Sequence, residues 1–149
     1  MQTYIEKGLD VTAIAFCEKL GDVKAIERFA AYFNSPSQIE KVVYNGNIQE
    51  CLNLFASAQF VIGTRFHSVI LALHFGKPVL PIAYNSKTPH YLRDVAFGGR
   101  VVNMNELDQE SLESLTSNFT SNYIADCEEH RKYAVNQFYG LKKYLENIE

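Results

Sequence analysis

The feature of this sequence that most constrains its fold is the alternation of short apolar runs with longer segments of helical periodicity. Apolar runs that predict strands lie at residues 10–18, 39–45, 59–63 and 78–84, and segments that predict helices follow them at 21–33, 47–58, 66–76 and 88–97. Strands that alternate with single helices and short turns are joined by right-handed crossovers and lie parallel. The pattern therefore predicts an α/β fold, with a Rossmann-like parallel sheet and helices on both faces.

Polar residues mark where two of these helices begin. Asp22 stands at the start of the segment 21–33 and is expected to cap it. Asn47 stands three residues before Glu50, which is the spacing of a capping box. A short edge strand is expected at residues 100–104, where the apolar run is brief.

The C-terminal part is predicted to be helical from Asp108 to its end. Mainly apolar residues recur there at alternating steps of three and four and form one long stripe, which Arg131 interrupts. Its members are Ile124, Cys127, Arg131, Ala134, Phe138, Leu141, Leu145 and Ile148. The stripe could pack against the domain's own sheet, or part of it could brace a neighbouring domain or subunit. The first residues, "QTYIEKGLD", also resemble the last turns of a helix. We therefore expect residues 1–149 to form a single Rossmann-like domain that is half of a larger protein.

Composition and charge exclude several functions. The formal net charge of -3 argues against a general binder of nucleic acids or membrane surfaces. No apolar run is long enough to span a bilayer, and the polar N-terminus is unlike a signal peptide. The three cysteines are widely spaced, without a C-x-x-C pair or zinc-finger spacing. We expect reduced thiols, no metal site and a cytoplasmic location.

The turn between the third strand and its helix carries the candidate functional residues. In an open parallel sheet, ligands bind beyond the carboxyl ends of the strands, and the first N–H groups of a helix attract anions. Arg65 offers a planar fork for phosphate or carboxylate, and His67 offers a donor or an exchangeable proton. Gly63 allows a close approach of the backbone, while Thr64 and Ser68 add hydroxyls. The turn therefore predicts an anion site.

Each of these residues also has a structural interpretation. Thr64 or Ser68 could cap the helix, Arg65 could pair with an acid, and a single histidine is more often structural than catalytic. The next strand ends in Tyr84, with Lys87 shortly after it. Because successive parallel strands are often neighbours, Lys87 could face the same pocket, or it could lie exposed in the loop.

These residues form a longer pattern, "GTRFHSVILALHFGKPVLPIAYNSK", from Gly63 to Lys87. The pattern resembles the C-terminal domain of the polysaccharide pyruvyltransferase family. The "G-x-R-x-H" and "G-x-P-x-x-x-I-x-Y" motifs of that family, with a lysine after the second, correspond to Gly63, Arg65, His67, Gly76, Pro78, Ile82, Tyr84 and Lys87. Gln59 and Asn85 stand where the family often has aspartate.

The resemblance implies a transferase that moves a pyruvyl group from phosphoenolpyruvate to two hydroxyls of a sugar. The acceptor would be a surface polysaccharide or a lipid-linked oligosaccharide, the product a cyclic ketal, and no cofactor would be needed. Arg65 would bind phosphate or carboxylate, His67 would be the catalytic donor of a hydrogen bond or proton, and Lys87 would balance the remaining charge. Thr64, Ser68, Gly63 and Tyr84 would complete the substrate site.

The resemblance also implies two domains arranged as in the GT-B glycosyltransferases, with this chain as the donor-side half. The isolated chain would then be inactive, because an N-terminal domain would supply the acceptor side. Two alternatives stay open. One is the nucleotide-sugar-binding half of a glycosyltransferase, against which "TRFHSVILAL" shows no acid near the helix start. The other is a non-catalytic remnant that binds an anion.

Overall fold

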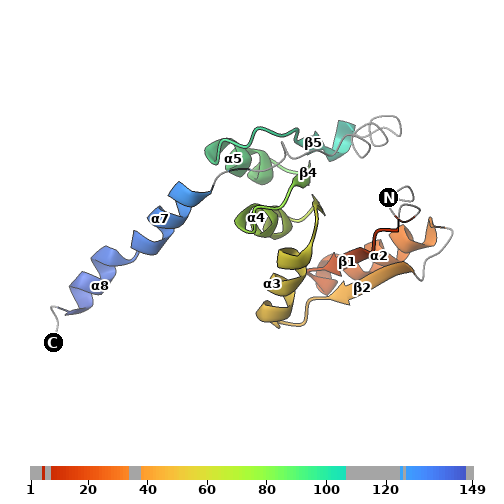
Figure 1. Ribbon diagram of the computed structural model, residues 1–149, viewed down its shortest axis with the longest axis horizontal. Helices are drawn as coiled ribbons and strands as arrows, with labels where there is room; N and C mark the ends of the chain where they lie inside the picture. The colour runs from red at the N-terminus through yellow and green to blue at the C-terminus, as the bar shows by residue number, and fades with distance from the viewer. Residues whose placement is uncertain (1–4, 6–7, 34–37, 107–124, 126, 147–149) are drawn as a thin grey trace. The chain divides into compact units, whose positions relative to one another are not determined.

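The computed structural model describes residues 5, 8–33, 38–106, 125 and 127–146 of the 149-residue chain. The chain divides into two compact units, Met1–Leu54 and Phe55–Glu149. Parallel strands alternate with helices in both, and two helices follow towards the C-terminus (Figure 1). The predicted α/β class with C-terminal helices is confirmed, whereas a single domain over residues 1–149 stays a prediction.

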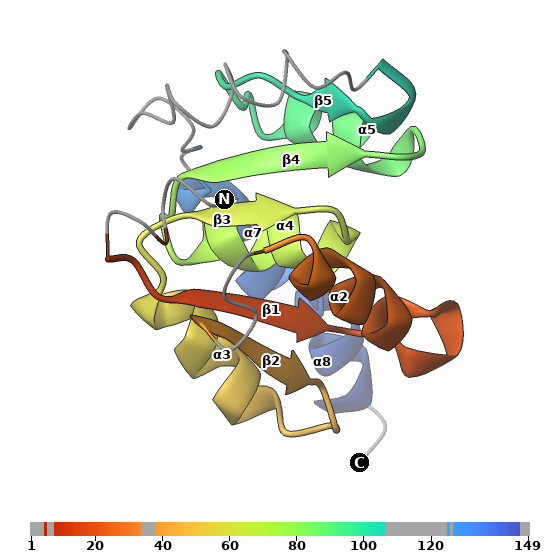
Figure 2. The same cartoon turned by 90° about the vertical axis from the view of Figure 1, so that its right-hand side faces the viewer.

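The first unit is built around two parallel strands, β1 (Val11–Ala15) and β2 (Ile39–Val43). They lie side by side, with Val11 opposite Ile39 and Ala15 opposite Val43 (Figure 2). The connection between them contains η1 (Glu18–Leu20) and α2 (Asp22–Ala31). The buried core consists of Ile5, Val11, Ala30 and Ile39, against which Phe29 and Phe33 pack.

The start of α2 corrects the prediction for Asp22. The N-cap is Gly21, whose φ of 82° is left-handed, and no side chain caps the helix. Because Asp22 is already inside the first turn, its Oδ2 accepts hydrogen bonds from the backbone N–H groups of Phe16 and Cys17, at 3.1 and 3.0 Å. The carboxylate therefore ties the end of β1 to the start of α2.

The helix α3 (Ile48–Ser57) begins where Asn47 predicts. Asn47 Oδ1 accepts a hydrogen bond from the N–H of Glu50, and Asn47 Nδ2 donates to Glu50 Oε2, both at 3.3 Å. The capping box is thus present, but Glu50 contacts the side chain of Asn47 because the backbone N–H of Asn47 already donates to Asn45 Oδ1 at 3.0 Å. Cys51 is buried on this helix.

The second unit holds a three-stranded parallel sheet in the order β3-β4-β5. Its elements, in chain order, are β3 (Val61–Gly63), α4 (Phe66–His74), β4 (Val79–Ala83), α5 (Lys87–Asp94), β5 (Val102–Asn103) and η3 (Met104–Glu106). All five residues of β4 are buried, and β5 is an edge strand as predicted (Figure 2). The strands that precede the two candidate turns, β3 and β4, are hydrogen-bonded neighbours, as predicted.

The C-terminal helices are present as predicted, but their side chains are not covered. The described helices are α7 (Glu128–Asn136) and α8 (Tyr139–Glu146), and every side chain from residue 128 to 146 is exposed. The prediction that this part of the stripe packs against the domain's own sheet was therefore wrong. An apolar periodicity shows that a helix has an apolar face, but it does not identify what covers that face. Bracing of a neighbouring domain or subunit stays a prediction. Residues 107–124 and 147–149, with Ile124 and Ile148, lie outside the described part.

A hydrogen bond joins α7 to the end of α4: the guanidinium of Arg131 donates to the backbone carbonyl of His74. None of the helices in the described ranges has the length and apolar character needed to cross a membrane.

Candidate functional site

The two candidate turns leave the same edge of the sheet in the second unit. β3 and β4 are parallel, with Gly63 opposite Pro81, so the turn after Gly63 and the turn after Ala83 both lie at carboxyl ends. Ligands of open α/β sheets bind at this edge. The topology therefore brings the Arg65 turn and the Lys87 turn together, as the sequence predicted.

Position 63 needs a glycine because there is no room for a side chain, and not because the backbone takes an unusual angle. It is buried at the end of β3, and a Cβ atom placed on it would lie 2.8 Å from Ser68 Oγ and 2.9 Å from Val69 Cγ2. Such distances are shorter than ordinary contacts of carbon atoms. The absence of a side chain therefore lets the strand end pack directly on the first turn of α4.

Ser68 fixes the shape of this turn. Its side chain is 5% exposed, and its hydroxyl donates a hydrogen bond to the carbonyl oxygen of Arg65 at 2.6 Å. The backbone N–H groups of Ser68 and Val69 donate to the same oxygen, at 3.0 and 3.3 Å. Three donors converge on one carbonyl, which holds Arg65 at the N-cap of α4.

The proposed capping role of Thr64 or Ser68 was wrong. The N-cap of α4 is Arg65, and no side chain caps the helix, because the hydroxyl of Ser68 is directed to a carbonyl. In the part of the chain that the structure describes, the first N–H groups of α4, those of Phe66 and His67, therefore have no side-chain cap. Uncapped N–H groups and the helix dipole favour an anion at this end.

The two cations at this edge are each placed on a ring from the other turn. The guanidinium carbon of Arg65 lies 6.0 Å from the ring centre of Tyr84, and Arg65 Nη1 is 3.5 Å from Tyr84 Oη. In the opposite direction, Lys87 Nζ lies 4.3 Å from the ring centre of Phe66. Both distances fall within the range of cation–π attraction. Arg65, Phe66, Tyr84 and Lys87 thus form one cluster across the two turns.

Lys87 is positioned by the turn that precedes it. Asn85 Oδ1 accepts a hydrogen bond from the backbone N–H of Lys87 at 3.0 Å, which is an Asx turn. Lys87 is the first residue of α5. The N-cap of that helix is Ser86, whose side chain makes no capping hydrogen bond. The amide of Asn85 shapes the turn without adding charge beside Lys87.

Phe66 is the member of the cluster that sequence reasoning missed. It opens an apolar helix and therefore resembles an ordinary core residue. Its ring lies under Lys87 Nζ, and its ring centre lies 5.5 Å from that of Tyr91 and 5.9 Å from that of His67. The sequence offers one signal: a ring stands directly after the cation in one turn and before it in the other.

Tyr91 contacts Phe66 and also interacts with Cys127. Burial raises the pKa of Tyr91 above its ordinary value, and the charge and hydrogen bond of Cys127 raise this pKa further. Cys127 is 8% exposed and stands at the N-cap of α7. Tyr91 therefore joins Phe66 to the start of the C-terminal helices.

His67 and Thr64 are exposed on the turn, so both side chains are accessible to a ligand. His67 contacts the ring of Phe66 and is one residue from it on α4. Over the described ranges, no group of three or more histidines, cysteines or acids is arranged to hold a metal ion.

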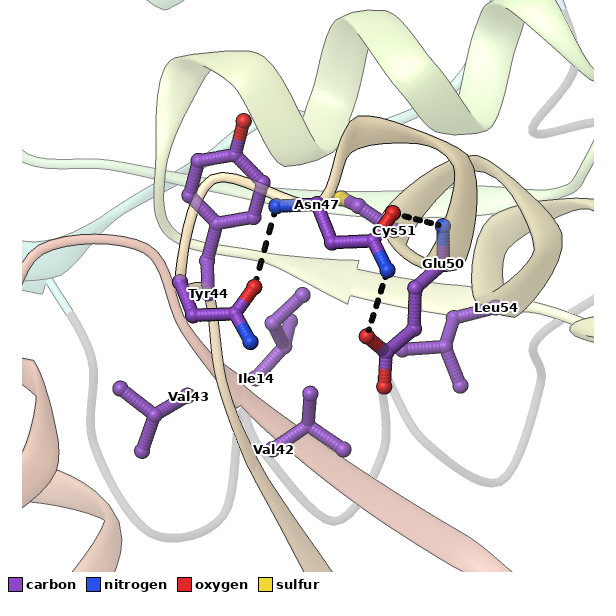
Figure 3. A pocket seen from close by; sticks show the side chains of 9 residues that line it. Ile14, Val42, Val43, Tyr44, Asn47, Glu50, Cys51 and Leu54 are labelled. Atoms are coloured by element: carbon purple, nitrogen blue, oxygen red, sulfur yellow. Dashed lines mark hydrogen bonds between the residues drawn. The ribbon is translucent and has the colours of Figure 1, made fainter.

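A separate hollow lies in the first unit, at the carboxyl end of β2. Figure 3 shows its lining, which consists of Ile14, Val42, Val43, Tyr44, Asn45, Asn47, Glu50, Cys51 and Leu54. Its polar groups bond to one another: Asn47 bonds to Glu50 and to Asn45. Burial raises the pKa of the Cys51 thiol, which lowers its reactivity. The polar residues of this hollow thus shape the start of α3.

Residues 2–86 match the family model described as polysaccharide pyruvyl transferase. The chain belongs to this family. The matched residues include Gly63, Arg65, His67 and Tyr84, and they end one position before Lys87. The family match therefore does not reach Lys87, and the place of Lys87 in the candidate site rests on its contact with Phe66.

The chain is also similar to the amylovoran biosynthesis protein AmsJ of Erwinia amylovora. The two are 25% identical over 124 residues, which cover 80% of this chain and 30% of AmsJ. This pyruvyl transferase family member thus spans less than a third of the length of that relative. No solved structure matches the chain.

Proposed function

We propose that this chain binds phosphoenolpyruvate at the carboxyl edge of β3 and β4, as the donor side of a polysaccharide pyruvyltransferase. The observation that carries the proposal is the convergence of Arg65 and Lys87 beside the uncapped first turn of α4. Membership of the pyruvyl transferase family supports the same donor.

The negative charges of phosphoenolpyruvate complement the positive charges of the site. Fully ionised phosphoenolpyruvate carries a phosphate and a carboxylate on one small carbon skeleton. The planar fork of Arg65 binds either group by two parallel hydrogen bonds, and the ammonium of Lys87 acts as a compact point charge. The backbone N–H groups of Phe66 and His67 donate hydrogen bonds to a phosphate oxygen at the helix start.

The reaction requires one proton at the donor and two hydroxyls from the acceptor. The methylene carbon of phosphoenolpyruvate takes a proton, and the neighbouring carbon then bonds to the first sugar hydroxyl. The second hydroxyl displaces the phosphate, which closes the cyclic ketal, and the two hydroxyl protons are balanced by the new methyl group and the released hydrogen phosphate. We assign to His67 a hydrogen bond or a proton for the donor, because its exposed imidazole follows the cation cluster on α4.

We assign only the donor side to this chain, because it spans 30% of AmsJ. The acceptor, a sugar of a surface polysaccharide or of a lipid-linked oligosaccharide, would bind to residues outside it. The isolated chain should therefore bind phosphoenolpyruvate and transfer no pyruvyl group. Ketal formation by the isolated chain would contradict this division.

The test is a calorimetric titration with phosphoenolpyruvate of the wild-type chain and of four variants. Arg65→Ala should weaken binding about a hundredfold or more, because part of the charge of the ligand loses its partner. Lys87→Ala should also weaken binding. Arg100→Ala and Lys77→Ala are the matched controls, because these cations precede β5 and β4 and so lie towards the amino ends of the parallel strands.

The same titration separates the alternative functions. Binding of a nucleotide sugar in place of phosphoenolpyruvate would favour the glycosyltransferase alternative. Equal affinity for phosphoenolpyruvate and inorganic phosphate would favour a remnant that binds simple anions. Unchanged affinity in Arg65→Ala, together with lost stability, would show that Arg65 is structural and that the site is elsewhere.

A further inference from the structure

Phe66 and Tyr84 form two crossed cation–π pairs with the cations of the opposite turns. Arg65 and Phe66 come from the turn after β3, and Tyr84 and Lys87 come from the turn after β4. Arg65 reaches the ring of Tyr84, while Lys87 reaches the ring of Phe66. Each turn therefore provides one cation and one ring, and each cation is held by the turn to which it does not belong.

We infer that Phe66 and Tyr84 are positioning residues, which hold Lys87 and Arg65 ready for the anionic donor without neutralising them. The inference rests on the proposed function, because it concerns the same two cations. We define this crossed arrangement of Arg65, Phe66, Tyr84 and Lys87 as the ring clasp.

A ring suits this role better than a carboxylate. A carboxylate would accept the hydrogen bonds of the ammonium and cancel its charge, so an incoming phosphate would have to compete with it. The face of a ring attracts the cation through its quadrupole and leaves the full charge in place. Lys87 is exposed and has a flexible four-carbon chain, so contact with Phe66 limits its positions while leaving N–H groups available to a ligand.

The ring of Phe66 is itself held in place by α5. Lys87 and Tyr91 are four residues apart on that helix and therefore lie on one face of it. Phe66 contacts both: its ring lies under Lys87 and meets Tyr91 at an interplanar angle of 82°. Tyr91 in turn interacts with Cys127. Two residues of α5 thus hold the ring of Phe66. The same contacts fix the position of Lys87 relative to the start of α4.

The first experiment measures the geometry without any ligand. A methylene group over an aromatic face gives proton resonances shifted upfield, so the ε-methylene of Lys87 should show this shift in the wild-type chain. Phe66→Leu should abolish it, and Phe66→Tyr should restore it. Phe75→Leu, a matched change beyond the other end of α4, should leave it unchanged. A wild-type chain without the shift would overturn the ring clasp.

The second experiment measures binding of phosphoenolpyruvate to the same variants by calorimetry. Phe66→Leu should weaken binding by about two- to fivefold, which is the size of one cation–π contact at an exposed site, and Phe66→Tyr should regain it. Tyr84 is 48% exposed, so Tyr84→Leu should fold and lose affinity by a similar factor, even if Phe66→Leu does not fold. Tyr84→Phe keeps the ring and should bind better than Tyr84→Leu.

The two experiments separate the ring clasp from the proposed function. Wild-type affinity in both leucine variants would overturn the positioning role while leaving the donor site intact. An upfield shift in a chain that does not bind phosphoenolpyruvate would overturn the proposed function, and with it the role of the rings in binding.

Discussion

Ser68 and Arg65 are joined by a hydrogen bond of 2.6 Å, from the hydroxyl of the buried serine to the backbone carbonyl of the arginine. The bond directs Ser68 Oγ to the space beside Gly63, where a Cβ atom would lie 2.8 Å away. A small residue, a buried hydroxyl and the cation proposed to bind the donor are therefore parts of one turn, and changes to them should separate stability from binding.

Gly63→Ala should destabilise the chain by about 1–3 kcal/mol, the usual cost of overpacking a tight site. The added methyl group would press on Ser68 and on Val69, which is fully buried and cannot easily move away. Urea denaturation measures the loss. Gly98→Ala is the control, because a Cβ atom there meets nothing within 4 Å, and it should leave the midpoint nearly unchanged.

Ser68→Ala should lower stability by about 0.5–1.5 kcal/mol through loss of the hydrogen bond to Arg65. It should weaken phosphoenolpyruvate binding less than Arg65→Ala does, because the backbone N–H groups of Ser68 and Val69 still bond to the same carbonyl. Denaturation and calorimetry on both variants give the comparison. A Ser68→Ala variant of normal stability with strongly reduced binding would mean that the hydroxyl contacts the ligand directly.

His67→Ala should reduce turnover of an assembled enzyme, one that also has the acceptor side, more than it reduces donor binding. The side chain is exposed, so its loss should leave the fold in place, and Phe66 is still held by Tyr91. Titration with phosphoenolpyruvate and the rate of phosphate release with acceptor present measure the two effects. Equal losses in affinity and turnover would indicate a binding role only.

Tyr91→Phe should reduce the loss of stability at alkaline pH. The pKa of Tyr91 is raised above its ordinary value of 10.0, so the folded chain keeps this proton at a pH where the unfolded chain loses it. The stabilisation is complete below the unfolded-state pKa and is lost as the pH rises through the folded-state pKa. Urea denaturation at about pH 8 and about pH 11 measures the difference on either side of the ordinary pKa.

Tyr139→Phe is the control for this experiment, because Tyr139 is 65% exposed. It should keep the alkaline loss of the wild-type chain. An identical pH dependence in Tyr91→Phe and the wild type would show that ionisation of Tyr91 is not linked to folding.

The sequence predicted the parts of this protein that depend on local pattern. The alternation of strands and helices gave the parallel order, and this order brought the Arg65 and Lys87 turns to one edge. Asn47 predicted the start of α3, because a cap and its partner lie three residues apart in the chain. Such features involve neighbours in sequence, or strand ends whose relation follows from topology alone.

Other parts depend on contacts that no local pattern contains. Asp22 bonds to N–H groups on the other side of η1, because Gly21 takes the cap position. Phe66 resembles a core residue until Lys87 is found over its ring. The periodicity of the last helices predicted a buried face, yet the described residues 128–146 are exposed, since periodicity alone does not identify a partner.

The two contacts that hold Lys87 and shape its turn have a kinetic consequence. Lys87 is held by a ring, and its turn is shaped by the amide of Asn85, so neither of these two contacts introduces an opposing charge. The positive potential of an exposed ammonium extends into solvent over roughly one Debye length, about 8–10 Å at moderate ionic strength. A trianionic donor would be drawn towards this edge before contact, so the clasp would set how often the donor arrives as well as how tightly it is held.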